Sequence, residues 1–434
     1  MSQTTADRFA RLKALQRPSV QPVSGHDVGP VGNAVEEESL GLASGVPIGS
    51  ERLALILGAS IKRNHHGEHL SLHCWHGGHA ARDPDAAALR LLAPGAPEGV
   101  ADAQQWLFLD TETTGIAGGT GTYPFLIGVA WWEGGGLQVE QLFMREYSEE
   151  RSLLAALAER MAERPVLVTF NGKSFDWPLL ETRYRMTRTI PPPTPRAHLD
   201  FLHPARNLWR LRLGSVRLSQ LERHVLGWDR GADIASELIP RIYLDFVRGG
   251  RAEPLVAVFQ HNQLDLRGLA GLSGRILSLL GDEEGTSQDG LELYGVSRIC
   301  ERRGEAKRAR RLYEQSIASA LPEETDRVAR AALARLAKRD GDFACAHELW
   351  ESVLGNSREG YQAYEQLAIY YEHEAREPRR ALALAREALD QLRRANQVGT
   401  VAATEYRQTK GRFEHRMLRL ERKASRTLLD TFGA

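Results

Sequence analysis

Two carboxylates stand directly after an apolar segment, where QWLFLD continues into TETTG. Because side chains alternate across a strand, Asp110 and Glu112 are expected on the same side, two rises of roughly 3.3 Å apart. Two anions held this close repel each other, which raises the pKa of one of them unless a hard cation lies between them. An ordinary solvated turn is the alternative, because Asp, Thr and Gly also favour turns. This pair alone leaves both interpretations open.

A third acid follows a second apolar segment, in VLVTFNGKSFDWPLL. The apolar run predicts a buried strand, after which Asn171 and Gly172 lead into a helix with Asp176 in its first turns. Turns between a strand and a helix bring polar groups to the edge of a sheet, where open α/β sheets bind ligands. Asp176 would otherwise only complement the helix dipole, with Ser174 as the N-cap. The position fits a metal ligand and a helix-terminal role equally well.

The segment FQHNQLDLRGLAGL has helical periodicity and places His261 and Asp265 four residues apart, on one helical face. A histidine has an unperturbed pKa near 6.5 and acts as a general base close to neutrality. If His261 is such a base, activity is expected to rise with pH through its titration. The alternative is a helix-stabilising pair in which Asp265 is partly buried.

The elements that must position these residues read as an α/β layer, a mixed sheet flanked by helices. Three predicted strands are joined by short turns, in QWLFLD, YPFLIGVAWW and LQVEQLFM. Helices and strands then alternate, with a helix in EERSLLAALAERMAE and strands in VLVTF and AHLDF. Antiparallel strands followed by strand–helix units are typical of a mixed sheet covered by helices.

The three motifs, taken together and in this order, resemble the DEDD exonuclease branch of the ribonuclease-H superfamily. With FN.KSFDWPLL, AHLDFLHPARNLWR, RLSQLERHVLG, the Pro240/Tyr243 segment and HN..D, the chain resembles the YprB-like family, bacterial predicted exonucleases with a ribonuclease-H-like domain. The resemblance covers residues 104–282 closely and the remainder loosely. In that branch the last motif reads Tyr with three intervening residues before Asp, or His with four. HNQLD combines His with the three-residue spacing and departs from both patterns.

The resemblance implies a 3′-to-5′ exonuclease acting on single-stranded or frayed DNA or RNA, with two Mg²⁺ or Mn²⁺ ions. It implies that Asp110 bridges both ions, that Glu112 and Asp265 complete one site, and that Asp176 helps to hold the other. His261 would take the proton from the attacking water. The physical argument agrees, since two cations roughly 3.5–4 Å apart stabilise both the entering and the leaving oxygen of a phosphoryl displacement.

Supporting substrate contacts are expected at Thr113, Thr114 and Asn171, which match positions that hydrogen-bond the terminal sugar and base in the resembled family. The alternative is that these residues only build turns and caps.

A basic strip is the second expected substrate contact. Residues 205–223 contain five arginines and a single acid, and Trp209 lies among the arginines in the sequence. Arg206 and Arg210 would bind phosphates and Trp209 would stack on a base, an interpretation that extends to Arg183. A solvated helix face explains the same pattern.

The chain is long enough for two or three domains. We expect a disordered segment at 1–50, a small α/β appendage at 51–103, the ribonuclease-H-like domain at 104–282 and a helical domain at 283–434.

The helical domain has small residues at a repeated spacing. Ala309, Ala346 and Ala381 lie 37 and 35 residues apart, close to the 34-residue tetratricopeptide repeat. The pattern predicts a tetratricopeptide-like all-α repeat domain, a possible site for a protein partner.

The composition restricts the remaining classes. Lys plus Arg and Asp plus Glu number 56 each, so a nucleic acid must be held by a local patch. Cys74, Cys300 and Cys345 have no paired spacing, which favours a reducing, cytoplasmic compartment. The longest apolar run falls far short of the roughly 20 residues of a membrane helix, so no membrane contact is expected. The histidine-rich stretch 65–79 has no zinc-finger spacing and predicts a polar strand and turn, with a structural zinc site as the alternative.

Two further functions remain open. The chain would be a non-catalytic scaffold if the helical repeats bind a partner and the nuclease-like domain only grips nucleic acid. It would be a structure-specific endonuclease if the same metal chemistry acts in a channel that accepts strands without ends.

Overall fold

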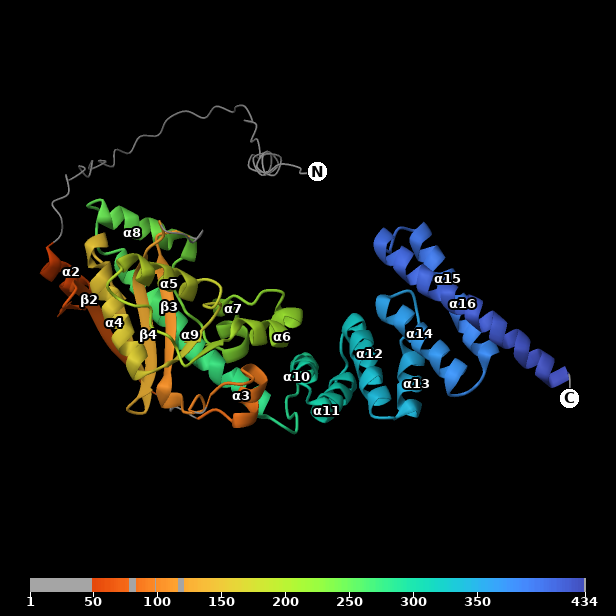
Figure 1. Ribbon diagram of the computed structural model, residues 1–434. Coiled ribbons are helices and arrows are strands. Elements are labelled where there is room, and N and C mark those ends of the chain that lie inside the picture. Colours follow the sequence, from red (N-terminus) through yellow and green to blue (C-terminus); the bar gives the residue numbers. More distant parts are fainter. Residues whose placement is uncertain (1–48, 78–82, 98, 116–120, 433–434) are drawn as a thin grey trace, which may run out of the picture. The chain divides into compact units, whose positions relative to one another are not determined.

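The structure is a computed structural model that describes residues 49–77, 83–97, 99–115 and 121–432 (Figure 1). Nearly all of the segment 1–50, which the sequence predicts to be disordered, lies outside these residues. The described chain consists of a sheet with its covering helices, followed by a region built of helices alone.

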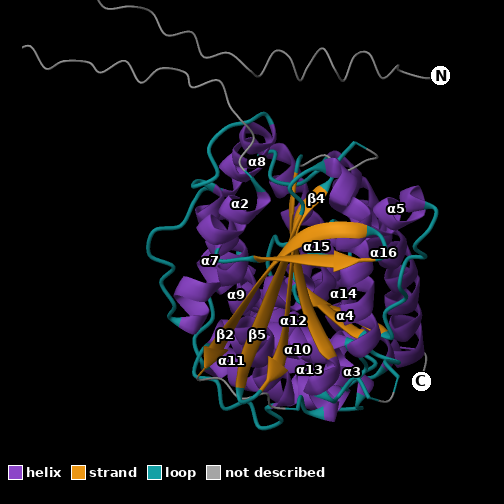
Figure 2. Cartoon of the chain, turned by 90° about the vertical axis from the view of Figure 1, so that its left-hand side faces the viewer, coloured by secondary structure: helices purple, strands orange, loops and turns teal. Residues whose placement is uncertain are grey.

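Seven strands form one mixed sheet in the order β1-β2-β5-β4-β3-β6-β7. Strand β3 pairs antiparallel with β4 and parallel with β6, which confirms the predicted mixed sheet. The strands fan out across the sheet in the view of Figure 2, as expected from the right-handed twist of β-strands. Their bounds are β1 (Ser60–Asn64), β2 (Gly67–Gly77), β3 (Trp106–Thr113), β4 (Pro124–Glu133), β5 (Gly136–Phe143), β6 (Val166–Thr169) and β7 (Ala197–Asp200).

The stretch 51–103 differs from the appendage expected there, because β1 and β2 extend the central sheet. Strand β2 pairs with β5 along its length, from Leu70 opposite Phe143 to Gly77 opposite Gly136. This pairing joins residues 59 to 73 positions apart in the sequence. Strand periodicity carries no information about which edge of a sheet a strand joins. The domain boundaries themselves stay predictions.

Helices cover both faces of the sheet, and alternate residues of β3 face different cores. Phe108 packs in one apolar cluster with Leu266 of α9, while Leu107 and Leu109 pack in the other with Leu154 of α4. The helices of this region are α2 (Ser50–Leu57), α3 (Ala86–Leu92), α4 (Glu150–Glu163), α5 (Asp176–Thr187), α6 (Leu202–Leu213), α7 (Leu218–Leu221), α8 (Ile239–Val247) and α9 (Leu255–Gly281).

From residue 290 to residue 432 the structure contains helices and turns and no strand, as predicted for an all-α region. Successive helices pack in pairs, α10 with α11, α12 with α13, and α14 with α15. Ala309, Ala346 and Ala381 are fully buried in the second helix of each pair. The tetratricopeptide assignment stays a prediction. The helices are α10 (Gly290–Arg302), α11 (Ala306–Ala318), α12 (Glu323–Arg339), α13 (Phe343–Ser352), α14 (Arg358–His373), α15 (Pro378–Gln397) and α16 (Ala403–Phe432).

Candidate active site

The predicted carboxylates meet at the carboxyl-terminal ends of β3 and β6. Strand β3 runs on through Thr113, past the predicted strand end, because its pairing with β4 continues to Thr113 opposite Pro124. Asp110 and Glu112 lie on the face of β3 that packs against α9, whereas Thr111 points to the other side. If Asp176 or Asp265 lay on the far side of the sheet from Asp110 and Glu112, the acids could not bind the same metal ions. Instead, Asp110 and Glu112 each interact electrostatically with both Asp176 and Asp265.

Asp110 is held by an amide from α9. The Nδ2 of Asn262 donates to Oδ2 of Asp110 at 2.8 Å, and the Oδ1 of Asn262 accepts from Nε2 of Gln141 at 2.9 Å. Gly128 pairs opposite Asp110, and a Cβ there would lie 2.1 Å from the Asn262 Oδ1. The missing side chain of Gly128 therefore makes the space in which Asn262 reaches the carboxylate.

Asp176 is bound from the sheet by a hydroxyl. The Oγ1 of Thr111 donates to Oδ1 of Asp176 at 2.5 Å. The alternative in which Ser174 caps the helix is wrong, since α5 begins at Asp176 and the preceding Phe175 makes no side-chain capping bond. Thus Asp176 is fixed by a contact with β3.

The turn before α5 is shaped by Asp200, at the end of β7. Its carboxylate accepts the backbone N–H groups of Asn171 at 2.8 Å and Lys173 at 3.0 Å. Asn171 has a φ of 71°, a left-handed conformation that asparagine tolerates. Its backbone thus has a structural role in this turn.

His261 lies between two carboxylates on α9 and on a neighbouring loop. Its Nδ1 is 2.7 Å from Oδ1 of Asp233, and its Nε2 is 3.5 Å from Oδ2 of Asp265. Arg230 bridges this group, since its guanidinium pairs with Asp265, with Asp233 at 3.0 Å and with Glu222. Asp233 therefore orients the imidazole from one side and leaves Nε2 facing the acids.

Burial and crowding disfavour the ionised forms of the carboxylates in the absence of a cation. Burial raises the pKa of Asp110 well above its ordinary value, and the neighbouring Asp265, Glu112 and Asp176 raise it further. Burial likewise raises the pKa of Glu112 to about 7, although His261 opposes this shift, and burial also raises the pKa of Asp176. The pKa of His261 is raised because Asp265, Asp233 and Glu112 outweigh the effect of burial.

The residues fit divalent cations. Ligand atoms of Glu112, His261 and Asp265 all lie within 4.8 Å of one another. Asp110 and Asp176 supply two more carboxylates close to this group, since Asp110 interacts electrostatically with Glu112, Asp176 and Asp265. Oxygen donors and uncompensated negative charge are what Mg²⁺ and Mn²⁺ favour in proteins.

A cleft of about 240 Å³ opens beside Glu112 and Asp176. Phe175 and Leu179 line it, and the Phe175 side chain is 58% exposed although it is large and apolar. An exposed ring next to acids suits stacking against a terminal base.

Thr113 and Thr114 remain compatible with both predicted roles, substrate binding and turn formation. Thr113 lines the cleft, but its hydroxyl donates to the Gly115 carbonyl at 2.8 Å. The Thr114 hydroxyl accepts the Tyr123 N–H at 3.0 Å. Both hydroxyls thus also build the turn.

The predicted basic strip is only partly exposed. Trp209 is fully buried and donates to Glu292 at 2.7 Å, so its stacking role is wrong. Arg183 is buried and donates to Glu150 at 2.7 Å, so it does not extend the strip. Arg206 and Arg210 are exposed on α6, where phosphate binding stays a prediction. Apolar periodicity in α6 turns Trp209 to the core.

The histidine-rich stretch forms part of a strand, as predicted. His69 is buried with its Nδ1 2.8 Å from the Ser152 hydroxyl, and His73 lies 3.2 Å from Glu140. Within the described part of the chain, its histidines do not enter a cluster of three potential metal ligands.

Four residues that build the site were not predicted, namely Thr111, Arg230, Asp233 and Asn262. Asn262 had a signal, because it adjoins His261 in a helix that must face the sheet. Arg230 and Asp233 lie in an aperiodic loop, and nothing local indicates that this loop folds over α9.

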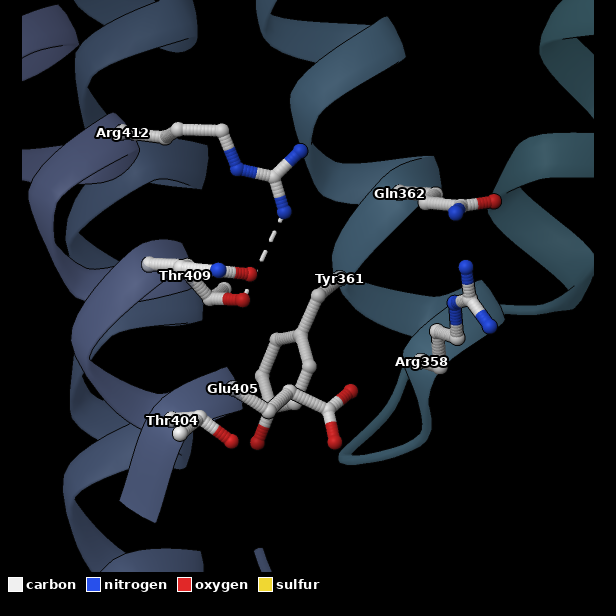
Figure 3. Close-up of a pocket in the computed structure, with 8 residues that line it drawn as sticks. Arg358, Tyr361, Gln362, Thr404, Glu405, Thr409 and Arg412 are labelled. Carbon is white, nitrogen blue, oxygen red and sulfur yellow. Dashed lines mark hydrogen bonds between the residues drawn. The ribbon is translucent and has the colours of Figure 1, made fainter. Parts of the chain in front are cut away.

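A second, larger hollow of about 700 Å³ lies in the helical region between α14 and α16 (Figure 3). Arg358, Gln362 and Arg412 line it, and Tyr361 points into it. The Tyr361 hydroxyl is buried and makes no hydrogen bond within the described structure. Two arginines and one acid, Glu405, line this groove, whereas several acids line the site on the sheet.

Comparisons with known proteins agree with the fold. The RNase_H superfamily model matches residues 107–276, a range that includes all four acids. The uncharacterized protein YprB of Bacillus subtilis (strain 168) is 31% identical over 285 residues, which cover 65% of this chain and 68% of YprB. A family B DNA polymerase from Pyrobaculum calidifontis aligns with a TM-score of 0.33 and 17% identity, over 46% of this chain and 29% of the polymerase. In the described residues, no helix has the length and apolar character to span a membrane.

Proposed function

Because the chain belongs to the YprB-like family of proteins with an RNase H-like domain, we propose that it is a divalent-metal-dependent 3′-to-5′ exonuclease on single-stranded DNA or RNA. The RNase H superfamily domain itself indicates nuclease function. One observation carries the finer proposal. Four acids from three distant segments gather in one site, where burial raises the pKa values of Asp110, Glu112 and Asp176.

Asp110, Glu112, Asp176 and Asp265 are the residues that would hold two Mg²⁺ or Mn²⁺ ions. When bound, such ions supply Lewis-acid stabilisation of the attacking and leaving oxygens of a phosphodiester. The chain contributes the positioning. Asn262 fixes Asp110 and Thr111 fixes Asp176, so the carboxylates need little reorganisation on binding.

His261 is the proposed general base. Its Nδ1–H donates to Asp233, which keeps the proton on that nitrogen and leaves Nε2 to accept a proton from water. Asp233 is held in turn by Arg230 at 3.0 Å. Arg230 also neutralises Asp265 and Glu222, so Asp233 can face His261 without adding its full charge to the acid cluster.

The cleft beside Glu112 is proposed to receive the terminal nucleotide. Phe175 offers an exposed ring for the base, and Leu179 and Pro240 close the apolar side. Base–aromatic stacking contributes about 1–3 kcal/mol and tolerates any sequence. This arrangement favours an enzyme that removes nucleotides without regard to their identity.

The test is hydrolysis of 5′-labelled single-stranded oligonucleotides with Mn²⁺ or Mg²⁺. The proposal expects a ladder that shortens from the 3′ end, no reaction in EDTA, and loss of the ladder in Asp110→Ala. Release that persists in Asp110→Ala would contradict it. Cleavage of circular strands would instead indicate an endonuclease, and tight binding without cleavage would indicate a scaffold.

A protein partner in the helical region is a second candidate role, favoured by the unpartnered Tyr361 hydroxyl in the groove of Figure 3. Arg358 and Arg412 outnumber Glu405, the one acid that lines the groove, so an extended segment rich in carbonyl or carboxylate acceptors would fit. Tyr361→Phe and Arg358→Ala would then weaken co-purification of the partner relative to wild type, with hydrolysis unchanged. We place both roles in the cytoplasm, because Cys74, Cys300 and Cys345 are free thiols.

A further inference from the structure

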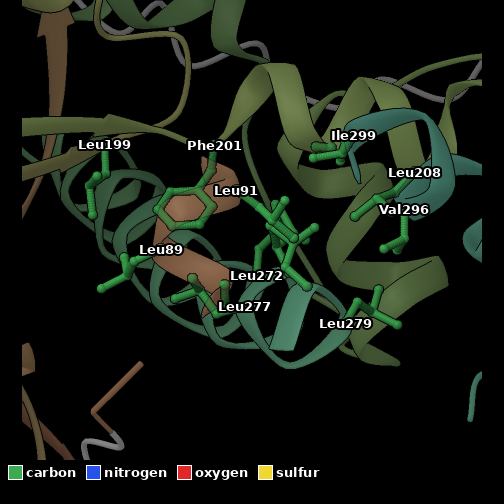
Figure 4. Packing of buried hydrophobic residues seen from close by; sticks show 14 of the residues in the cluster. Leu89, Leu91, Leu199, Phe201, Leu208, Leu272, Leu277, Leu279, Val296 and Ile299 are labelled. Carbon is green, nitrogen blue, oxygen red and sulfur yellow. The ribbon is translucent and has the colours of Figure 1, made fainter. Parts of the chain in front are cut away.

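A third cleft, of about 360 Å³, lies where the sheet meets the first helix of the helical region. Leu91, Pro204, Leu280 and Ile299 form its apolar lining, and Leu91 and Ile299 lie near each other in the packing of Figure 4. Its volume falls within the range of small-ligand sites, roughly 300–1,000 Å³. It is distinct from the cleft beside Glu112, with which it shares no lining residue.

The rim of this cleft is basic. Lys173, His203, Arg302 and Arg303 line it, against the single acid Asp200. The Asp200 carboxylate is already occupied, because it accepts N–H groups of the turn before α5 and of α6. The cleft therefore presents net positive charge over an apolar floor.

Two of its cations are available to a ligand. Among the described residues, Lys173 and Arg302 are exposed and form no ion pair. Arg303 is different, since its guanidinium donates to the carbonyls of Leu91 and Leu92 and so joins α10 to α3. The nearby Arg308 also has a structural role, because it donates to the Leu280 carbonyl at 2.6 Å.

The two sides of the cleft are held together firmly. Helices α6 and α10 pack closely, and Leu208 of α6 shares an apolar cluster with Val296 and Ile299 of α10 (Figure 4). Trp209 donates to Glu292 across the same contact at 2.7 Å. Arg302 therefore belongs to the wall of a fixed site, although it comes from the helical region.

The cleft also lies at the catalytic edge of the sheet. Asp200 ends β7, which runs parallel to β6 and β3, so all three strands end at this edge. Lys173 precedes Asp176 by three residues, and three steps of 3.8 Å place their Cα atoms within about 11 Å. A strand that leaves the site beside Asp176 thus reaches Lys173 first and the basic cleft next.

We propose that this cleft binds the substrate strand on the 5′ side of the bond to be cut, with phosphates on Lys173 and Arg302 and a sugar and base on the apolar floor. The exposed Arg206, one turn beyond His203 on α6, extends the same track. The first helices of the helical region are then part of the nucleic-acid site. This inference rests on the proposed exonuclease function for the direction of the strand, and on charge and shape for the binding itself.

Binding is measured without hydrolysis, by fluorescence anisotropy of single-stranded oligonucleotides of about 4 and about 16 nucleotides in EDTA. The full-length double variant Lys173→Glu/Arg302→Glu is expected to bind the longer oligonucleotide at least about 10-fold more weakly, with a smaller loss for the shorter one. Its slope of log K against log salt is expected to fall by about 1.4, since each phosphate contact on a single strand contributes about 0.7.

The matched control is the double variant Arg379→Glu/Arg394→Glu, the same charge change at two exposed positions of α15, which is expected to bind as wild type does. Thermal melting checks that each variant is folded. Wild-type affinity and salt slope in the double variant would overturn the inference. So would competition by polyglutamate as strong as that by an oligonucleotide of equal charge.

The two proposals fail separately. If wild type binds the long oligonucleotide through this cleft but releases no nucleotides with Mn²⁺, the cleft stands and the exonuclease proposal is wrong. If wild type degrades the strand and the double variant binds it as well as wild type does, the exonuclease proposal stands and the cleft proposal is wrong.

Discussion

Two groups of carboxylates, on β5 and β3 of one sheet with β4 between them, have opposite electrostatics. Glu140 on β5 is matched by Arg160, whose Nε donates at 2.5 Å, and by the Ser71 hydroxyl at 3.0 Å. His73 and Arg160 hold the pKa of Glu140 at about 2, against burial, which by itself would raise it. Asp110 and Glu112 are buried too, but acids surround them and their pKa values rise.

This difference separates an acid that stabilises the fold from acids that serve chemistry. A buried carboxylate with its cation in place contributes to stability, whereas a buried acid cluster without enough cations is destabilising until one binds. Arg230 neutralises Asp265 in part, but Asp110 accepts only a neutral amide. The missing positive charge at Asp110 is what points to metal ions.

The largest effect is expected from Asp110→Asn, which keeps the shape of the side chain and removes its charge. Hydrolysis should fall on the order of 1,000-fold or more, because the acid central to the ion site is lost. Stability in EDTA should stay or rise, because repulsion with the other acids is relieved. Initial rates measure the hydrolysis, and thermal melts measure the stability. A clear loss of stability in EDTA would contradict the claim that the acid cluster at Asp110 is destabilising without cations.

Glu140→Gln should behave in the opposite way, with loss of stability and near-normal hydrolysis at low temperature. The pKa of Glu140 falls from its ordinary 4.5 to about 2, equivalent to about 3 kcal/mol at most. Because the folded pKa is the lower one, this stability is present above pH 4.5 and is lost as pH falls toward 2. Denaturant melts at several pH values should show the difference between wild type and variant shrinking over that range. A constant difference would contradict the assignment.

Gly128→Ala should reduce hydrolysis by roughly 10- to 100-fold, the range typical of lost support to a metal ligand. The added methyl group would meet the Asn262 Oδ1 at 2.1 Å and push the amide away from Asp110. Gly274→Ala, on α9 where an added Cβ meets nothing within 4 Å, is the control. Equal rates of hydrolysis in both variants would contradict the proposal that Asn262 positions Asp110.

Asp233→Asn should have the smallest effect, about a 10-fold loss of kcat with KM kept, since the amide oxygen still accepts from Nδ1 of His261 but the charge is gone. Asp245→Asn, an exposed acid on α8, serves as the control. A change confined to KM would show that Asp233 acts on substrate binding and does not position His261.

The sequence predicted what local spacing can carry. Alternation on a strand put Asp110 and Glu112 on one side, and helical periodicity put His261 and Asp265 on one face, and the structure has both arrangements. It did not predict that β2 extends the sheet, because that requires pairing with a distant strand.

The errors in the site have the same cause. The arginines around Trp209 in the sequence predict an exposed ring that stacks on a base. The ring is buried instead, because burial depends on which face of α6 meets α10. Asp233 lies in an irregular loop, and its contacts with His261 and Arg230 depend on how this loop folds over α9. Contacts between segments without periodicity are set by the whole fold, so a single sequence gives no signal for them.

Equilibrium binding of Mn²⁺ tests the central claim most directly, because it does not depend on finding the right substrate. Calorimetric titration of wild type should show two ions bound per chain in the presence of a non-hydrolysable oligonucleotide, and a raised melting temperature. Asp110→Asn should lose both while remaining folded, and Glu140→Gln should retain both. Equal Mn²⁺ binding by wild type and Asp110→Asn would contradict the assignment of the acid cluster as a metal site.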